Sequence, residues 1–179
     1  MEPISQYWFE DNKVIKIKKI FLGGPIKNAI EKSGFNGGLK QTILDTLQLL
    51  QEANFEVDSA LTEGYLEEER VHALEASITP TEATAGDYQG VVESDIYVCL
   101  WPNGVDGQPF RSDGMCIELG WATASKIPCI LIREISANHS DIVVGLEAIG
   151  AVEHIDFPTF MQSPDVLLEA IETMNRKLN

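Results

Sequence analysis

Glu118 is the residue of this chain whose setting most suggests chemistry. It is the single charged residue in the ten-residue run from Met115 to Ala124, Met-Cys-Ile-Glu-Leu-Gly-Trp-Ala-Thr-Ala. Removing a carboxylate from water is costly, so an acid in an apolar segment is a candidate for a reactive group. The structural alternative is that Glu118 lies on the polar edge of a helix whose other faces are buried.

The residues just before Glu118 predict the start of a helix. Ser112 can cap that helix, and Asp113 and Gly114 follow it. The free N–H groups and positive dipole of a helix start favour an anion, so we expect them to help keep Glu118 ionised. Glu118 is about one turn along the helix, and its side chain can lean back over the helix start.

Apolar segments alternate with amphipathic segments along the rest of the chain. A capping box at Thr79-Pro80-Thr81-Glu82 predicts another helix start, and the helix that follows carries Asp87 and ends near Ser94. The remaining helices are expected from Leu39 to about Asn54 and from Ser163 onward. Strands are expected at residues 19–22, 55–57, 95–101, 127–132 and 152–156.

This alternation predicts an α/β fold with a flavodoxin-like, doubly wound, parallel sheet of about five strands and helices on both faces. We expect a single domain over residues 1–179, with residues 1–13 as an N-terminal extension. Residues 62–76 are acidic and helical in pattern and are expected on the surface, while residues 134–150 are either a loop or a short helix.

Ligands of such sheets bind beyond the carboxyl ends of the strands, where the strand order reverses. For the flavodoxin-like order this point lies between the first and third strands. The segment from Gly23 to Lys27 and the segment that begins at Trp101 meet there, and the helix that starts at Ser112 points its amino end at the same crevice.

Three segments together resemble the nucleoside 2-deoxyribosyltransferase superfamily, which includes related N-glycosidases of nucleoside monophosphates. They are Phe-Leu-Gly-Gly-Pro-Ile-Lys at 21–27, Asp87 eight residues before Asp95, and Ser112-x-Gly114-x-x-x-Glu118-Leu-Gly. The resemblance covers residues 19–133. It implies cleavage of an N-glycosidic bond, with transfer of the sugar to another base or to water, and a homodimer or larger assembly.

The resemblance also implies roles for individual residues. Glu118 would attack the anomeric carbon and form a covalent glycosyl intermediate, and Asp87 would manage the proton on the departing base. A phosphate on the sugar would be bound by Ser112, Lys27 and the backbone amides of the Gly23 segment, although Asp113 would oppose it. The implied substrate-binding residues are Gly23, Gly24, Pro25, Lys27, Trp101, Ser112, Asp113 and Gly114.

Trp101 and Phe21 each leave an alternative open. Trp101 could stack on a base or belong to the core. Members of the family commonly have a tyrosine in the first strand, with its hydroxyl near the nucleophile, where this chain has Phe21. Tyr88 or Tyr97 could supply the missing hydroxyl. Phe21 also keeps open the alternative of a catalytically silent nucleotide-binding or sensing module on the same fold.

Composition excludes several classes of protein. The formal net charge is −15, with 13 basic and 28 acidic residues, which opposes binding to nucleic acid polymers or anionic membranes. The start lacks a secretory pattern, and Cys99, Cys116 and Cys129 are expected to be free buried thiols, so a cytoplasmic protein is predicted. The histidines are scattered, and no metal or cofactor is expected. The resemblance implies a small nucleoside or nucleotide as the partner.

Overall fold

The computed structural model describes residues 16–25, 38–59, 79–104 and 106–179. Five strands form one sheet in the order β2-β1-β3-β4-β5, and every neighbouring pair is parallel. This is the flavodoxin-like order, so the predicted fold is confirmed. The strands are β1 (Lys19–Gly23), β2 (Glu56–Asp58), β3 (Ile96–Trp101), β4 (Cys129–Arg133) and β5 (Val152–Asp156).

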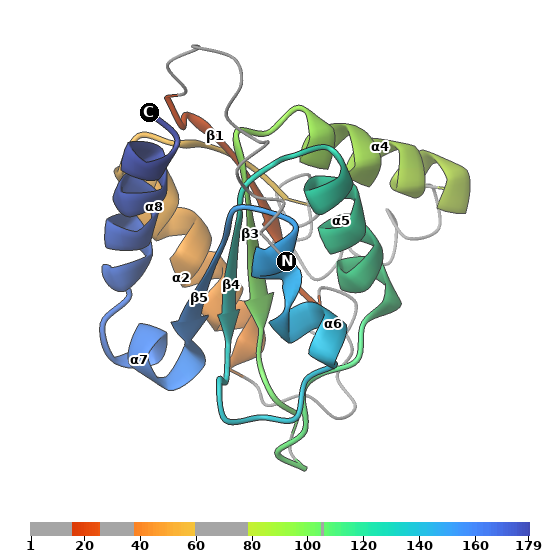
Figure 1. The fold of residues 1–179 in the computed structure, drawn as a ribbon, viewed down its shortest axis with the longest axis vertical. Coiled ribbons are helices and arrows are strands. Elements are labelled where there is room, and N and C mark those ends of the chain that lie inside the picture. Colours follow the sequence, from red (N-terminus) through yellow and green to blue (C-terminus); the bar gives the residue numbers. More distant parts are fainter. Residues whose placement is uncertain (1–15, 26–37, 60–78, 105) are drawn as a thin grey trace.

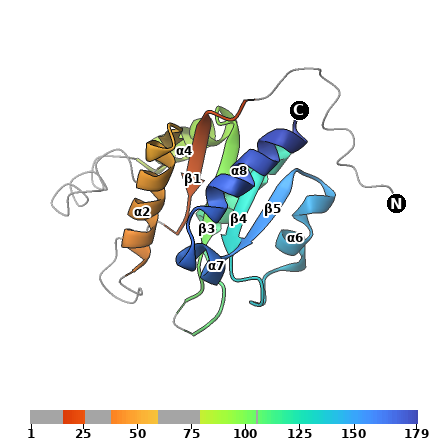
Figure 2. The same cartoon turned by 90° about the vertical axis from the view of Figure 1, so that its left-hand side faces the viewer.

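Helices cover both faces of the sheet (Figures 1 and 2). On one face lie α2 (Leu39–Glu52), α7 (Phe157–Gln162) and α8 (Val166–Lys177). On the other lie α4 (Pro80–Val92), α5 (Asp113–Ala124), α6 (Asp141–Val144) and the short 3₁₀ turn η2 (Leu146–Ala148). None of the helices in the described ranges is long and apolar enough to span a bilayer.

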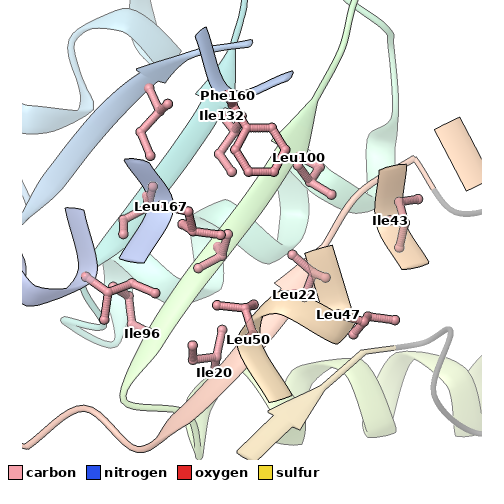
Figure 3. Close-up of a cluster of buried hydrophobic side chains, with 14 of the residues drawn as sticks. Ile20, Leu22, Ile43, Leu47, Leu50, Ile96, Leu100, Ile132, Phe160 and Leu167 are labelled. Carbon is pink, nitrogen blue, oxygen red and sulfur yellow. The ribbon is translucent and has the colours of Figure 1, made fainter. Parts of the chain in front are cut away.

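Strand β3 is buried on both faces, as its continuous apolar sequence predicts. Because successive side chains of a strand point to opposite faces, β3 contributes to two separate cores. Ile96, Val98 and Leu100 pack beneath α2 and α8, in the cluster drawn in Figure 3. Tyr97, Cys99 and Trp101 pack beneath α4 and α5.

Local signals set the helix boundaries near the Glu118 segment. The predicted capping box at the start of α4 is present, because Thr79 Oγ1 accepts from the Glu82 N–H and the Glu82 carboxylate accepts from the Thr79 N–H. Ser112 Oγ accepts from the Met115 N–H at 3.4 Å and caps α5. Asn54, with φ of 66°, ends the turn after α2.

Several expectations need correction or lie outside the described residues. Helix α7 was not expected, because it has six residues and no side-chain cap hydrogen bond. Cys116 was expected to be buried but is exposed, because it lies on the outer side of α5; Cys99 and Cys129 are buried, and all three thiols are free. Residues 1–13, Lys27 and the acidic segment 62–76 lie outside the described ranges.

Candidate active site

Glu118 lies in the second turn of α5 with its side chain turned into the protein. The residue is 8% exposed. The hydroxyl of Tyr97, a fully buried residue of β3, donates a hydrogen bond of 2.8 Å to Glu118 Oε2. The carboxylate is therefore out of water and held by one strong donor. The alternative, an acid on the polar edge of the helix, does not fit this burial.

Gly23 fixes where the Tyr97–Glu118 pair lies. A Cβ atom at Gly23 would lie 2.4 Å from Tyr97 Oη and 2.7 Å from Glu118 Oε2, both closer than real contacts allow. Only glycine fits at this position. Because Gly23 ends β1 and pairs with Cys99 of β3, the Tyr97–Glu118 pair lies beside the carboxyl end of β1, where the sheet order predicts a ligand site.

Burial dominates the acidity of Glu118. It raises the pKa of the carboxyl group from 4.5 to about 7, against the hydrogen bond from Tyr97, while the charge of Asp87 adds to the rise. Glu118 therefore gives up its proton at a higher pH than an ordinary glutamate does. Burial therefore has a larger effect on the pKa of Glu118 than the start of α5, which we expected to keep this carboxyl group ionised.

Asp87 approaches the same region from α4. It is half-buried, and burial raises its pKa, with a further contribution from the charge of Asp58 at the end of β2. Gly90 brings α4 close to the sheet, since a Cβ there would lie 2.6 Å from the Phe21 ring and 3.0 Å from Asp58 Oδ2. Asp87 is therefore an acid with a raised pKa whose charge acts on Glu118.

Tyr97 of β3 supplies a hydroxyl to Glu118, whereas Phe21 of β1 has none to offer. Phe21 of β1 stacks on the Tyr97 ring, with centroids 6.0 Å apart and an interplanar angle of 23°. The hydroxyl at Glu118 therefore comes from β3, which pairs with β1. Tyr88 is 48% exposed and packs edge-on against Trp121 at 5.4 Å. Of the two tyrosines considered from the sequence, Tyr97 is the one that contacts Glu118.

The other predicted residues lie around the crevice at different depths. Gly24 and Pro25 are buried directly after β1, whereas Asp113 and Gly114 are exposed in the first turn of α5. Ser112 caps α5, as predicted, and its role toward a phosphate stays a prediction. Lys27 lies outside the described residues.

Trp101 packs into the core rather than onto an open surface. The residue is 5% exposed, and its Nε1 donates to the Phe110 carbonyl oxygen at 2.6 Å. Its ring lies edge-on to His139, with centroids 5.2 Å apart. These contacts engage both the N–H group and the ring of Trp101. They favour a packing role in the core over stacking on a base.

Sequence reasoning missed four polar residues on this side of the sheet: Asp58, Arg133, His139 and His154. Asp58 and Arg133 each end a strand, which is a usable signal because side chains there face the ligand edge of the sheet. His139 and His154 carried no such signal. Within the described ranges, no three His, Cys, Asp or Glu side chains are grouped to hold a metal ion.

Solved structures with the same fold were found by structural comparison. The Clostridium botulinum CMP N-glycosidase BcmB is 24% identical, covers 83% of this chain and 99% of its own, and superposes with a TM-score of 0.54. The solution structure of BlsM is 22% identical, with 93% of each chain covered and a TM-score of 0.60. A conserved protein from Enterococcus faecalis V583 is 16% identical, with 88% and 99% covered and a TM-score of 0.59.

No protein-family model and no curated protein matches the sequence. At these identities the structural likeness establishes the architecture and not the activity. The chain therefore has the five-stranded α/β fold that BcmB and BlsM share.

Proposed function

We propose that this protein belongs to the nucleoside 2-deoxyribosyltransferase superfamily and cleaves the N-glycosidic bond of a nucleoside or nucleoside monophosphate. The observation that carries the proposal is the Glu118 carboxylate, buried beside the carboxyl end of β1 and held by the Tyr97 hydroxyl. A desolvated carboxylate is suited to capture the oxocarbenium-like carbon of a sugar.

In the first step, an oxygen of ionised Glu118 forms a bond to the anomeric carbon as the bond from that carbon to the base nitrogen breaks. The electron pair of the broken bond leaves with the base, which takes a proton from Asp87. The raised pKa of Asp87 supports this role, because burial makes the protonated form of the carboxyl group more favourable than in water.

In the second step, water or another base attacks the same carbon and displaces Glu118. Asp87, now ionised, takes the proton of the attacking group. The Tyr97 hydroxyl stabilises the carboxylate both before capture and after release. The protein is then a hydrolase with water as acceptor and a transferase with a second base.

The comparisons support a nucleotide as substrate without deciding it. BcmB is named a CMP N-glycosidase, and it shares the fold of this chain at 24% identity. Ser112, Lys27 and the Gly23 segment would bind a 5′-phosphate if the substrate carries one. We also propose a cytoplasmic homodimer or larger assembly, in line with the resemblance.

Release of free base from a panel of nucleosides and nucleoside monophosphates, followed by chromatography, tests the proposal. We expect Glu118→Gln to lower the rate by at least about 10³-fold, because it removes the nucleophile itself. Glu169→Gln is the matched control, since Glu169 is an exposed glutamate of α8. Mass spectrometry of the quenched wild-type reaction should find the sugar attached to Glu118.

Two outcomes would contradict the proposal. Base release that survives Glu118→Gln excludes Glu118 as the nucleophile. Saturable nucleotide binding by calorimetry without turnover of any compound in the panel identifies the silent binding module instead.

A further inference from the structure

A second polar cluster lies at the carboxyl edge of the sheet, over β4 and β5 and beyond the β1–β3 crevice. Arg133 is the last residue of β4, His154 lies in β5, and His139 lies in the loop that follows β4. We call these three residues the Arg133 cluster. Arg133 is 4% exposed and His139 is 8% exposed, so the cluster is built into the interior.

The contacts within the Arg133 cluster leave donors unused. Arg133 Nε donates to His154 Nδ1 at 3.1 Å, so the proton of His154 is on Nε2. His139 is held by a hydrogen bond to the Glu134 backbone and by its ring contact with Trp101. Three buried nitrogens have no hydrogen-bond partner in the described part of the chain: Arg133 Nη1, His139 Nε2 and His154 Nε2. His154 Nε2 lies 4.0 Å from Glu147 Oε2, beyond hydrogen-bond distance.

The charge of Arg133 is also poorly compensated. A guanidinium stays ionised inside a protein, and a buried charge is stable only when it is paired. Asp156 and Glu147 act on Arg133 from a distance, without forming an ion pair with it in the described ranges. Asp156 Oδ1 accepts from the Ile135 N–H, and Glu147 is 67% exposed at its side chain.

The two histidines are kept neutral in this setting. Burial lowers the pKa of His139 and of His154, and the nearby charge of Arg133 lowers both further. Neutral imidazoles add hydrogen-bonding capacity around the guanidinium without adding charge repulsion. A bound anion would pair with Arg133 and raise the pKa of both imidazoles, because a nearby negative charge favours their protonated form.

We propose that the Arg133 cluster binds a small oxyanion, namely a phosphate group, either free or at the end of a sugar phosphate. Arg133 Nη1 and His154 Nε2 each donate to a phosphate oxygen, and His139 Nε2 donates once it is protonated. The donor set suits phosphate because a guanidinium and imidazoles supply charge-assisted hydrogen bonds to its oxygens. Bound phosphate would satisfy the unpaired groups and neutralise the buried cation.

Side-chain NMR of the full chain tests this site directly. The Arg133 Nε–H and the imidazole resonances of His139 and His154 are followed during titration with inorganic phosphate and, separately, with a pentose 5-phosphate. A titration with sodium chloride at matched ionic strength corrects for screening, which matters for a chain of net charge −15. We expect saturable shifts with a phosphate compound and none with chloride.

Variants then assign the effect to Arg133. Arg133→Gln should weaken phosphate binding at least about tenfold, because it removes the charge and the paired donors. Arg176→Gln is the matched control, since Arg176 is an exposed arginine whose Nη2 contacts Thr173. If Arg133→Gln does not fold, His139→Gln replaces it and is expected to weaken binding severalfold.

The outcomes separate this site from the proposed catalysis and from its alternatives. Glu118→Gln should bind phosphate as the wild type does, whether or not the wild type releases base. Shifts with both phosphate compounds support a site for the free ion, and shifts with the sugar phosphate alone support an organic phosphate. Absence of saturable shifts, or equal shifts with chloride, would overturn the proposal and leave buried water as the partner of these groups.

Discussion

Both faces of the sheet are covered by helices, but the two cores are built from different kinds of residues. Beneath α2 and α8 the hydrophobic core is large, with Ile20, Leu50 and Leu167 fully covered, and the buried polar residues of α2 are the uncharged Thr42 and Thr46. Beneath α4, α5 and α6 the core includes Tyr97 and the two buried cysteines. Glu118, Arg133 and His139, the buried acidic and basic residues of the described ranges, also lie on this second side.

This difference indicates that one face of the sheet mainly stabilises the fold and the other face carries the groups suited to a reaction. The apolar side provides hydrophobic burial without any charge to compensate. The polar side holds groups whose pKa values are shifted by that same burial, which is unfavourable for folding and useful for a reaction. Strand β3 joins the two, because alternate residues of one strand belong to each side.

Leu50→Ala should have the largest effect on stability, and it acts on the apolar side. Leu50 is 0% exposed in the core beneath α2, so truncation leaves a cavity that costs about 2–5 kcal/mol. Denaturant unfolding measures the loss. Base release at a temperature where the variant is folded should match the wild type, and a large loss of activity there would contradict the separation of the two faces.

Glu118→Gln should instead stabilise the protein, and only at high pH. The pKa of Glu118 rises from 4.5 in the unfolded chain to about 7 in the native state. The free energy of unfolding therefore falls as the pH rises from about 4.5 to about 7. The ionised native state is thereby destabilised by roughly 3 kcal/mol above pH 7, and glutamine removes this loss. Urea unfolding should show the gain at pH 8 and none at pH 4.5.

The same Glu169→Gln control applies to this measurement, because Glu169 is exposed. An equal gain at both pH values would mean that packing, and not the proton on Glu118, sets the effect.

Tyr97→Phe should have the smallest effect, a shift in acidity. It removes the hydrogen bond that lowers the pKa of Glu118, so this pKa should rise by about one pH unit while the fold is kept. Carbon NMR of the Glu118 carboxyl group measures the titration, and the pH at which base release reaches half its maximum should rise in parallel. Tyr88→Phe, at an exposed tyrosine, should leave both unchanged.

Much of the fold and part of the site could be predicted from the sequence, because the signals are local. The alternation of apolar segments indicates the doubly wound sheet, and the Thr79 capping box and Ser112 mark the starts of α4 and α5. The uncharged run around Glu118 predicts that this acid is buried, as it is. These signals depend only on periodicity and on residues within one helical turn of each other.

The partners of Glu118 were decided by the tertiary structure. Tyr97 reaches Glu118, 21 residues away, because β1 and β3 pair in a register that places Gly23 beneath both side chains. Asp58 approaches Asp87, and Arg133 bonds His154, through contacts between elements that no sequence period encodes. Strand register and helix packing set these distances, so the sequence determines which acid is buried and the assembled sheet determines what holds it.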